Sequence, residues 1–145
     1  MAKLVVSILG SLDGYCAGPG GRLDALPMAS AFDLHNLALM RSADTFLFGA
    51  KTFPLFESYW PSVDRGSLGE PVPREIAERF ETARKLVVSD KLVVAQTSPW
   101  ANCPVVRRCS AHARVGDLKS RTGKDLVMFG SPILANDLLA HGLVD

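Results

Sequence analysis

Small and hydroxyl-bearing residues follow three apolar runs of the sequence, at the points where predicted strands end. Gly49-Ala50-Lys51-Thr52 follows one run, Ser89-Asp90-Lys91 follows another, and Gly130-Ser131 a third. Glycine lets a backbone approach a ligand closely, and a helix that begins at such a corner directs unpaired N–H groups at an anion. Lys51 adds a cation and Thr52 a hydroxyl. Together the three corners predict a cradle for phosphate groups.

Each corner also has an ordinary structural explanation. The first is a turn with a surface lysine, and at the second Asp90 would repel a phosphate. At the third, Ser131 suits the N-cap and Pro132 the first position of a helix, which explains both residues without a ligand. Three such corners in one short chain favour binding over coincidence.

Two carboxylates are candidates for holding a substrate. Asp13 directly follows the first predicted strand, and Asp33 lies in the first predicted helix. Asp13 has an alternative role as the cap of a turn at Gly14, and Asp33 as an exposed helix residue. The histidines stand at no ligand spacing with cysteines or carboxylates, so the sequence predicts no metal site. It also contains no G-x-S-x-G or Walker-type motif.

Strands and helices alternate along the chain. Unbroken apolar runs predict strands at residues 3–9, 44–49, 85–90, 104–108 and 125–130, with 91–96 either an edge strand or an extended loop. Helical spacing and end signals predict helices at 30–43, near 52–60, and at 73–84, 111–123 and 132–142. A long loop spans residues 10–30. This order predicts one α/β domain whose mostly parallel sheet is covered on both faces and binds ligands beyond the carboxyl ends of its strands.

Composition narrows the function. The 145 residues are 48% hydrophobic and carry a net charge of +1, which argues against a nucleic-acid or membrane-surface binder. No apolar run approaches the roughly 18 residues of a membrane span. Three cysteines without a C-x-x-C pattern favour reduced thiols in a cytoplasmic protein.

Four stretches in this order carry a resemblance that spans nearly the whole chain: KLVVSILGSLDGY, ADTFLFGAKTF, RKLVVSD followed by PWANCPVVR, and DLVMFGSPILANDLLAHGLVD. The chain resembles the dihydrofolate reductase-like family, and most closely its riboflavin-biosynthesis reductase branch. The resemblance implies a three-layer α/β/α fold and NADPH-dependent reduction of a small heterocyclic substrate that is pyrimidine- or pterin-like. It also implies a homodimer.

The resemblance implies that four segments of the chain contact the cofactor. Their contact residues would be Ala17 and Gly18, then Gly49, Lys51 and Thr52, then Ser89 and Lys91, and finally Gly130, Ser131, Ile133 and Leu134. In that order the segments would face the nicotinamide, the side of the adenosine 2′-phosphate, the adenosine, and the diphosphate. Ala50 replaces the arginine that usually follows the glycine in this family. Asp33 resembles in its placement the acid that grips the pterin ring.

The resemblance leaves two points open. Relatives continue beyond HGLVD with a closing antiparallel hairpin, so residues 1–145 are expected to form one C-terminally incomplete domain. Its uncovered sheet edge predicts either a dimer that covers the gap or a partly defective protein. Two other functions stay open: a true dihydrofolate reductase, for which no residue is assignable to the folate tail, and a non-catalytic nucleotide-binding module.

Overall fold

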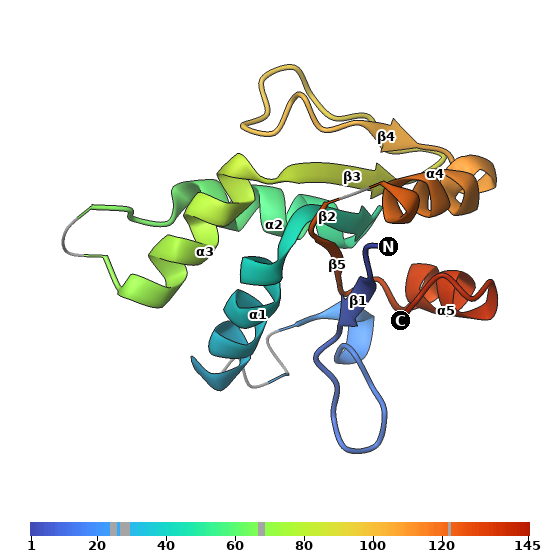
Figure 1. The fold of residues 1–145 in the computed structure, drawn as a ribbon. Helices are drawn as coiled ribbons and strands as arrows, with labels where there is room; N and C mark the ends of the chain where they lie inside the picture. The colour runs from blue at the N-terminus through green and yellow to red at the C-terminus, as the bar shows by residue number, and fades with distance from the viewer. Residues whose placement is uncertain (24–25, 27–29, 67–68, 122) are drawn as a thin grey trace.

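Five short strands form one sheet at the centre of the computed structural model, which describes residues 1–23, 26, 30–66, 69–121 and 123–145 (Figure 1). The strands in chain order are β1 (Leu4–Ser7), β2 (Ala43–Gly49), β3 (Arg84–Val88), β4 (Val105–Val106) and β5 (Asp125–Phe129). Their order across the sheet is β1-β5-β2-β3-β4, and every pairing is parallel. The predicted parallel sheet is confirmed, and residues 91–96 are loop rather than strand.

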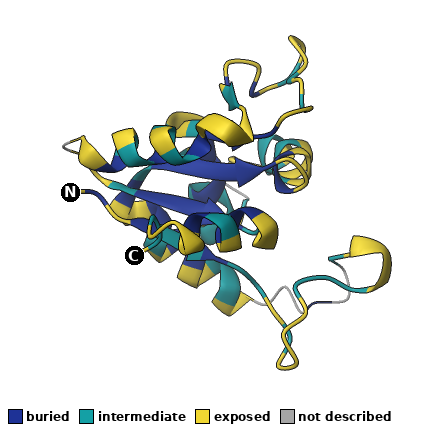
Figure 2. Cartoon of the chain, turned by 90° about the vertical axis from the view of Figure 1, so that its right-hand side faces the viewer, coloured by how far each residue is buried: buried dark blue, intermediate teal, exposed yellow. Residues whose placement is uncertain are grey.

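Helices cover both faces of the sheet. They are α1 (Ser30–Ser42), α2 (Thr52–Tyr59), α3 (Pro71–Thr82), α4 (Arg108–Ser120) and α5 (Pro132–Ala140), with short 3₁₀ turns η1 (Pro19–Gly21) and η2 (Trp60–Ser62). Helices α1, α2 and α3 pack on one face and α4 and α5 on the other. Figure 2 shows the strands as the buried middle layer, which confirms the predicted three-layer fold. None of the helices in the described ranges is long and apolar enough to cross a membrane.

The alternation of side chains along β2 and β5 explains why both strands are apolar without a break. Phe46 and Phe48 enter the core beneath α1, α2 and α3, whereas Leu47 between them enters the core beneath α4 and α5. Phe129 and Met128 divide between the same two cores. Because successive strand residues point to opposite faces, a sheet that is covered twice needs apolar residues at every position.

Several helix boundaries differ from the sequence prediction, among them the start of α3 at Pro71 and the end of α4 at Ser120, and for two others the structure shows the reason. Helix α3 ends at Thr82, because Ala83 is already extended and Arg84 begins β3. Helix α4 begins at Arg108, earlier than predicted. The Asp90 carboxylate, which follows β3, accepts a hydrogen bond from the Arg108 N–H and so caps the start of this helix. The end of α5 follows the prediction: Gly142 has φ +64°, and its N–H donates to the carbonyl of Leu139 at 3.0 Å.

Strand β1 lies at one edge of the sheet, and the last residue of the chain lies beside it. The Asp145 N–H donates to the Leu4 carbonyl at 3.1 Å, and an Asp145 carboxylate oxygen accepts from the Leu4 N–H at 2.9 Å. The buried Lys119 amine donates to the same carboxylate, which holds the pKa of Asp145 below its usual value. Residue 145 is thus held along β1 by hydrogen bonds. The homodimer expected from the sequence stays a prediction.

Candidate functional site

A cavity of about 570 Å³ opens where the carboxyl ends of the strands meet. Each of four strand ends contributes to its wall: Ser7 from β1, Gly49 from β2, Ser89 after β3 and Gly130 after β5. All strands run in parallel, so their carboxyl ends share one edge of the sheet. The prediction that the three glycine- and hydroxyl-bearing corners lie together is confirmed.

A hydrogen-bonded network joins the corners of β2 and β5. The Gly49 N–H donates to Ser131 Oγ at 2.9 Å, and that oxygen lies 2.8 Å from Thr52 Oγ1. A side chain at position 49 would place its Cβ 2.3 Å from Ser131 Oγ. Gly49 is therefore small because Ser131 occupies the space next to it, a reason that the sequence did not indicate.

The backbone at Gly130-Ser131 turns sharply, with φ +59° at Gly130 and φ +55° at Ser131. The left-handed region is unusual for a residue other than glycine, and here it directs the serine hydroxyl to β2 instead of over its own helix. The expectation that the Ser131 side chain caps α5 is therefore wrong. The N-terminus of α5, which includes Ile133 and Leu134, borders the cavity without that cap.

The corner after β3 is arranged by Ser89 and Asp90. Ser89 Oγ accepts hydrogen bonds from the N–H groups of Lys91 and Leu92, at 3.2 and 2.9 Å. Ser89 is buried and lines the cavity. Asp90, which was expected to repel a phosphate, is instead engaged at the start of α4.

Basic and apolar side chains both line the cavity. Lys51, Lys91 and Arg108 line it, against the single carboxylate of Asp90 among the described lining residues. Sequence reasoning missed Arg108, although it ends the predicted strand 104–108 and so occupies the same kind of position as the other corners. The larger apolar residues of the lining come from the segment after β1, from α1 and α2, and from β3, β5 and α5: Ile8, Leu9, Leu23, Leu26, Phe32, Leu55, Phe56, Val88, Phe129, Pro132, Ile133 and Leu134.

The residues that the resemblance assigned to the cofactor line this cavity with one exception. Gly18 is absent from the lining, because its N–H donates to the Arg22 carbonyl at 2.7 Å and its carbonyl accepts from Gly21 at 3.0 Å, which closes a turn. Ala17 beside it does line the cavity. Whether these residues contact a cofactor stays a prediction.

The two candidate carboxylates lie in different surroundings. Asp13 is exposed in a turn closed by Ser11 and Tyr15, outside the cavity lining, and its contact with a substrate stays a prediction. Its carboxylate does not cap that turn either, since the Ser11 hydroxyl accepts the Tyr15 N–H. Figure 2 shows the loop after β1 extending away from the body of the molecule, which explains the exposure of Asp13.

Asp33 is half-buried in the first turn of α1, and burial raises the pKa of its carboxyl. One turn further along the same helix, the buried Asn36 accepts a hydrogen bond of 2.6 Å from Ser7 Oγ at the end of β1. Asp33 does not itself line the cavity. It lies on α1, whose Asn36 is hydrogen-bonded to Ser7 of the cavity wall.

A second cavity of about 400 Å³ lies at the opposite end of the sheet, by the first residues of β3. Lys85, Trp100 and Cys103 line it. Burial raises the pKa of the Cys103 thiol to about 11, so the thiol stays protonated and unreactive at neutral pH. Burial lowers the pKa of Lys85, whose amine donates to the carbonyls of Phe80 and Ala83 and lies 5.2 Å from the Trp100 ring centroid. The groups in this cavity are therefore structural.

Comparison with known proteins places these observations in a family. The model of the RibD C-terminal domain matches residues 2–145. The uncharacterized protein YyaP of Bacillus subtilis (strain 168) is 24% identical over 143 residues, which cover 99% of this chain and 70% of that protein.

Two solved structures share the fold. A putative riboflavin biosynthesis protein from Shewanella sp. PV-4 matches with a TM-score of 0.62 and 20% identity, over 100% of this chain and 73% of that one. A diaminohydroxyphosphoribosylaminopyrimidine deaminase/5-amino-6-(5-phosphoribosylamino)uracil reductase from Thermotoga maritima matches with a TM-score of 0.55 and 18% identity, over 97% of this chain but only 42% of that one. The fold, the converging strand ends and the family model agree, and the chain belongs to the RibD C-terminal domain family.

Proposed function

We propose that this protein is an NADPH-dependent reductase of a small heterocyclic substrate. The observation that carries the proposal is the convergence of four strand ends on one cavity, which both cations and apolar side chains line. An extended dinucleotide needs both kinds of contact, because its phosphates are anionic and its nicotinamide is a flat ring.

The residues present fit the phosphates of such a cofactor. The space that a Cβ would fill at Gly49 is closed by Ser131, so the backbone itself forms this part of the cavity wall. Helices α2 and α5 begin at the cavity without side-chain caps, and N–H groups at helix N-termini bind anions. Lys51, Lys91 and Arg108 would supply charge-assisted contacts for a 2′-phosphate or the diphosphate.

The apolar side chains of the lining would contact the nicotinamide and the substrate. Bound NADPH would supply a hydride, which leaves the protein to orient the rings, exclude water and hold a proton. Asp33 is the sequence-based candidate for the last role, and the structure places it next to Phe32 of the cavity lining rather than in the lining itself. A pyrimidine-like substrate is favoured by the reductase activity in the name of the Thermotoga maritima relative, and a pterin-like one is the second choice.

Two measurements test the proposal. Titration of the folded protein into NADPH, followed by cofactor fluorescence, is expected to give saturable binding. Oxidation of NADPH is then expected with a riboflavin-pathway aminopyrimidine and not with dihydrofolate. Binding with turnover of dihydrofolate would identify a true dihydrofolate reductase instead, and binding without any turnover a nucleotide-binding module. A folded protein that does not bind NADPH would contradict the proposal.

Replacement of Lys51 by alanine is expected to reduce the preference for NADPH over NADH by about tenfold. A charge-assisted contact contributes about 1.5–3 kcal/mol, and the exposure of Lys51 favours the lower end of this range. The measurement is the ratio of the two dissociation constants. Lys124→Ala, an exposed lysine before the amino end of β5, is the matched control. An unaltered ratio in Lys51→Ala would mean that another residue holds the 2′-phosphate.

Replacement of Asp33 by asparagine is expected to lower turnover while leaving NADPH affinity unchanged and the fold at least as stable at pH 7. Since burial raises the pKa of Asp33, the folded state holds this proton more tightly than the unfolded chain. The group's contribution to stability therefore falls as pH rises through its folded-state pKa. The stability gain of Asp33→Asn should vanish below about pH 3.9, the ordinary value for aspartate.

Thermal unfolding at several pH values and steady-state kinetics check this prediction together. Glu78→Gln, the same kind of replacement at an exposed position of α3, should change neither measurement. Full turnover by Asp33→Asn would remove Asp33 from the proposed mechanism without affecting the cofactor assignment.

A further inference from the structure

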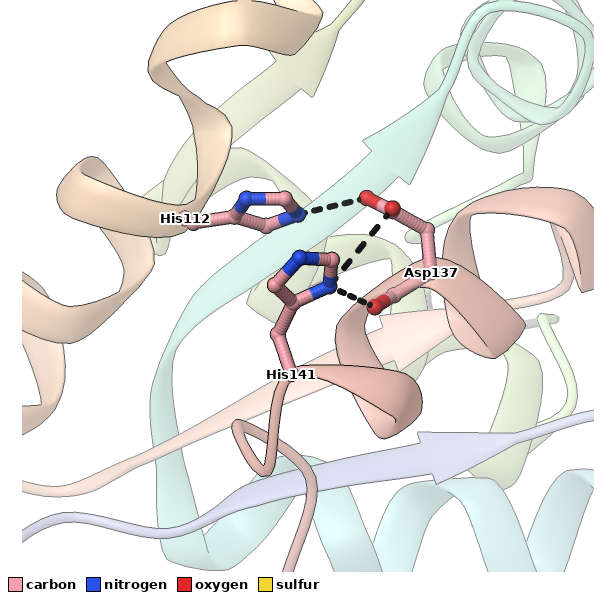
Figure 3. A group of neighbouring side chains, drawn as sticks. All are labelled: His112, Asp137 and His141. Carbon is pink, nitrogen blue, oxygen red and sulfur yellow. Dashed lines mark hydrogen bonds and ion pairs between the residues drawn. The ribbon is translucent and has the colours of Figure 1, made fainter.

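Two histidines and an aspartate from α4 and from the end of α5 meet on the face of the sheet that these two helices cover (Figure 3). His112 lies on α4, Asp137 on α5, and His141 directly after α5. His112 Nε2 lies 2.7 Å from one carboxylate oxygen of Asp137, and His141 Nδ1 lies 3.8 Å from the other. One possible ligand atom from each residue lies within 4.8 Å of those of the other two. We propose that His112, Asp137 and His141 bind a divalent transition-metal ion, with Zn²⁺ as the probe.

The donor set suits such an ion. Imidazole nitrogen and carboxylate oxygen are ligands that zinc accepts at about 2.0–2.2 Å, and imidazole also suits copper and nickel. Asp137 and His141 stand four residues apart, so successive turns of the chain present them on one side of α5. His112 approaches from the neighbouring helix, and its ring stacks on that of His141 with centroids 3.8 Å apart. Figure 3 shows both rings directed at Asp137.

Binding would require the two stacked imidazole rings to turn so that one nitrogen of each faces the ion. The ion would replace the proton shared between His112 and Asp137, and the ring of His141 would turn its nitrogen from the Asp137 carbonyl, 2.8 Å away, to the ion. The side chains of the three residues are 35%, 42% and 52% exposed, which leaves them room to move and lets an ion enter from solvent. Three protein ligands leave a coordination position for water, as in open zinc sites.

Such an ion would join α4 to α5. Both helices begin at the cavity, where Arg108 and Pro132 line the wall, so the ion would join the first half of α4 to the far end of α5 and hold together two helices that border the proposed cofactor site. The inference departs from the sequence-based expectation of no metal site. His112 and Asp137 are 25 residues apart, and only the packing of α4 beside α5 brings them together. The proposed metal site does not depend on the proposed reductase function.

The test is a calorimetric titration of Zn²⁺ into the full chain without an affinity tag. We expect one ion per chain and a higher thermal unfolding temperature in its presence. His112→Asn and His141→Asn should each weaken binding at least about tenfold, since even partners outside the ligand shell contribute 10–100-fold. His35→Asn is the matched control, because His35 is the exposed histidine of α1.

Cys109→Ser provides the second control, because this exposed thiol lies one turn before His112 on α4 and could bind zinc by itself. Circular dichroism establishes that each variant is folded, and Asp137→Asn offers a third replacement that keeps the side-chain shape. No saturable binding by the folded wild-type chain would overturn the inference and leave the cluster as a hydrogen-bonded bridge between helices. Binding that survives both histidine replacements, or that is lost in Cys109→Ser, would overturn it as well.

Discussion

Replacement of Gly49 by alanine is expected to abolish measurable NADPH binding at concentrations that saturate the wild-type protein, and to destabilise the fold. The added Cβ would lie 2.3 Å from Ser131 Oγ and 2.7 Å from Ser131 Cβ, so Ser131 must leave its place beside β2. Overpacking of this kind costs about 1–3 kcal/mol, and the lost hydrogen bond from the Gly49 N–H about 1 kcal/mol more. These costs lower the free energy of unfolding, whereas NADPH affinity falls because the displaced Ser131 belongs to the cavity wall.

Fluorescence titration and denaturant unfolding of Gly49→Ala measure the two effects separately. Gly116→Ala is the matched control: this glycine lies inside α4 with nothing within 4 Å of its added Cβ. Alanine there should leave NADPH affinity unchanged and stabilise the helix by about 0.5–1 kcal/mol. Normal affinity in Gly49→Ala would show that the corner between β2 and β5 is not part of the cofactor site.

Replacement of Gly130 by valine is expected to lower both stability and NADPH affinity. Gly130 has φ +59°, a region that costs a side-chain-bearing residue about 1–2 kcal/mol and a β-branched one more. Its Cβ would also lie 3.1 Å from Thr52 Oγ1, which bonds to Ser131. The backbone conformation therefore adds a penalty in the folded state itself to the loss of binding.

Gly142→Val separates these two contributions. Gly142 has a similar φ of +64°, but nothing lies within 4 Å of its added Cβ. Its replacement should therefore show the backbone strain without the crowding against Thr52, and leave NADPH affinity unaltered. The measurements are unfolding in denaturant and the NADPH dissociation constant. Equal effects of the two valines on both quantities would mean that Gly130 has no special role in the site.

The parts of the fold that the sequence predicts are those determined by burial. Leu126 to Phe129 read as a strand because both faces of the sheet are covered, and Gly142 ends α5 through a local backbone conformation. Both signals are contained in a few neighbouring residues. The positions of Gly49, Ser89 and Gly130 at one edge of the sheet follow from the parallel order of the strands.

The parts that the sequence does not predict depend on residues far apart in the chain. The Gly49 N–H and the Ser131 hydroxyl are 82 positions apart, so the hydrogen bond that determines the role of Ser131 has no local signal. The capping of Arg108 by Asp90 and the approach of His112 to Asp137 are contacts of the same kind, over 18 and 25 positions. Capping rules based on neighbouring residues assign Ser131 to its own helix, and only the left-handed backbone shows otherwise.

The central claim is that NADPH binds in the cavity at the carboxyl ends of the strands. Heteronuclear NMR of the amide groups during an NADPH titration measures the location of binding. Binding in the cavity at the carboxyl ends of the strands predicts large shifts for the amides of Gly49, Thr52, Gly130 and Ser131, with little change at Thr45 and Lys85 by the second cavity. Shifts concentrated at Thr45 and Lys85, or no shifts in a folded sample, would contradict it.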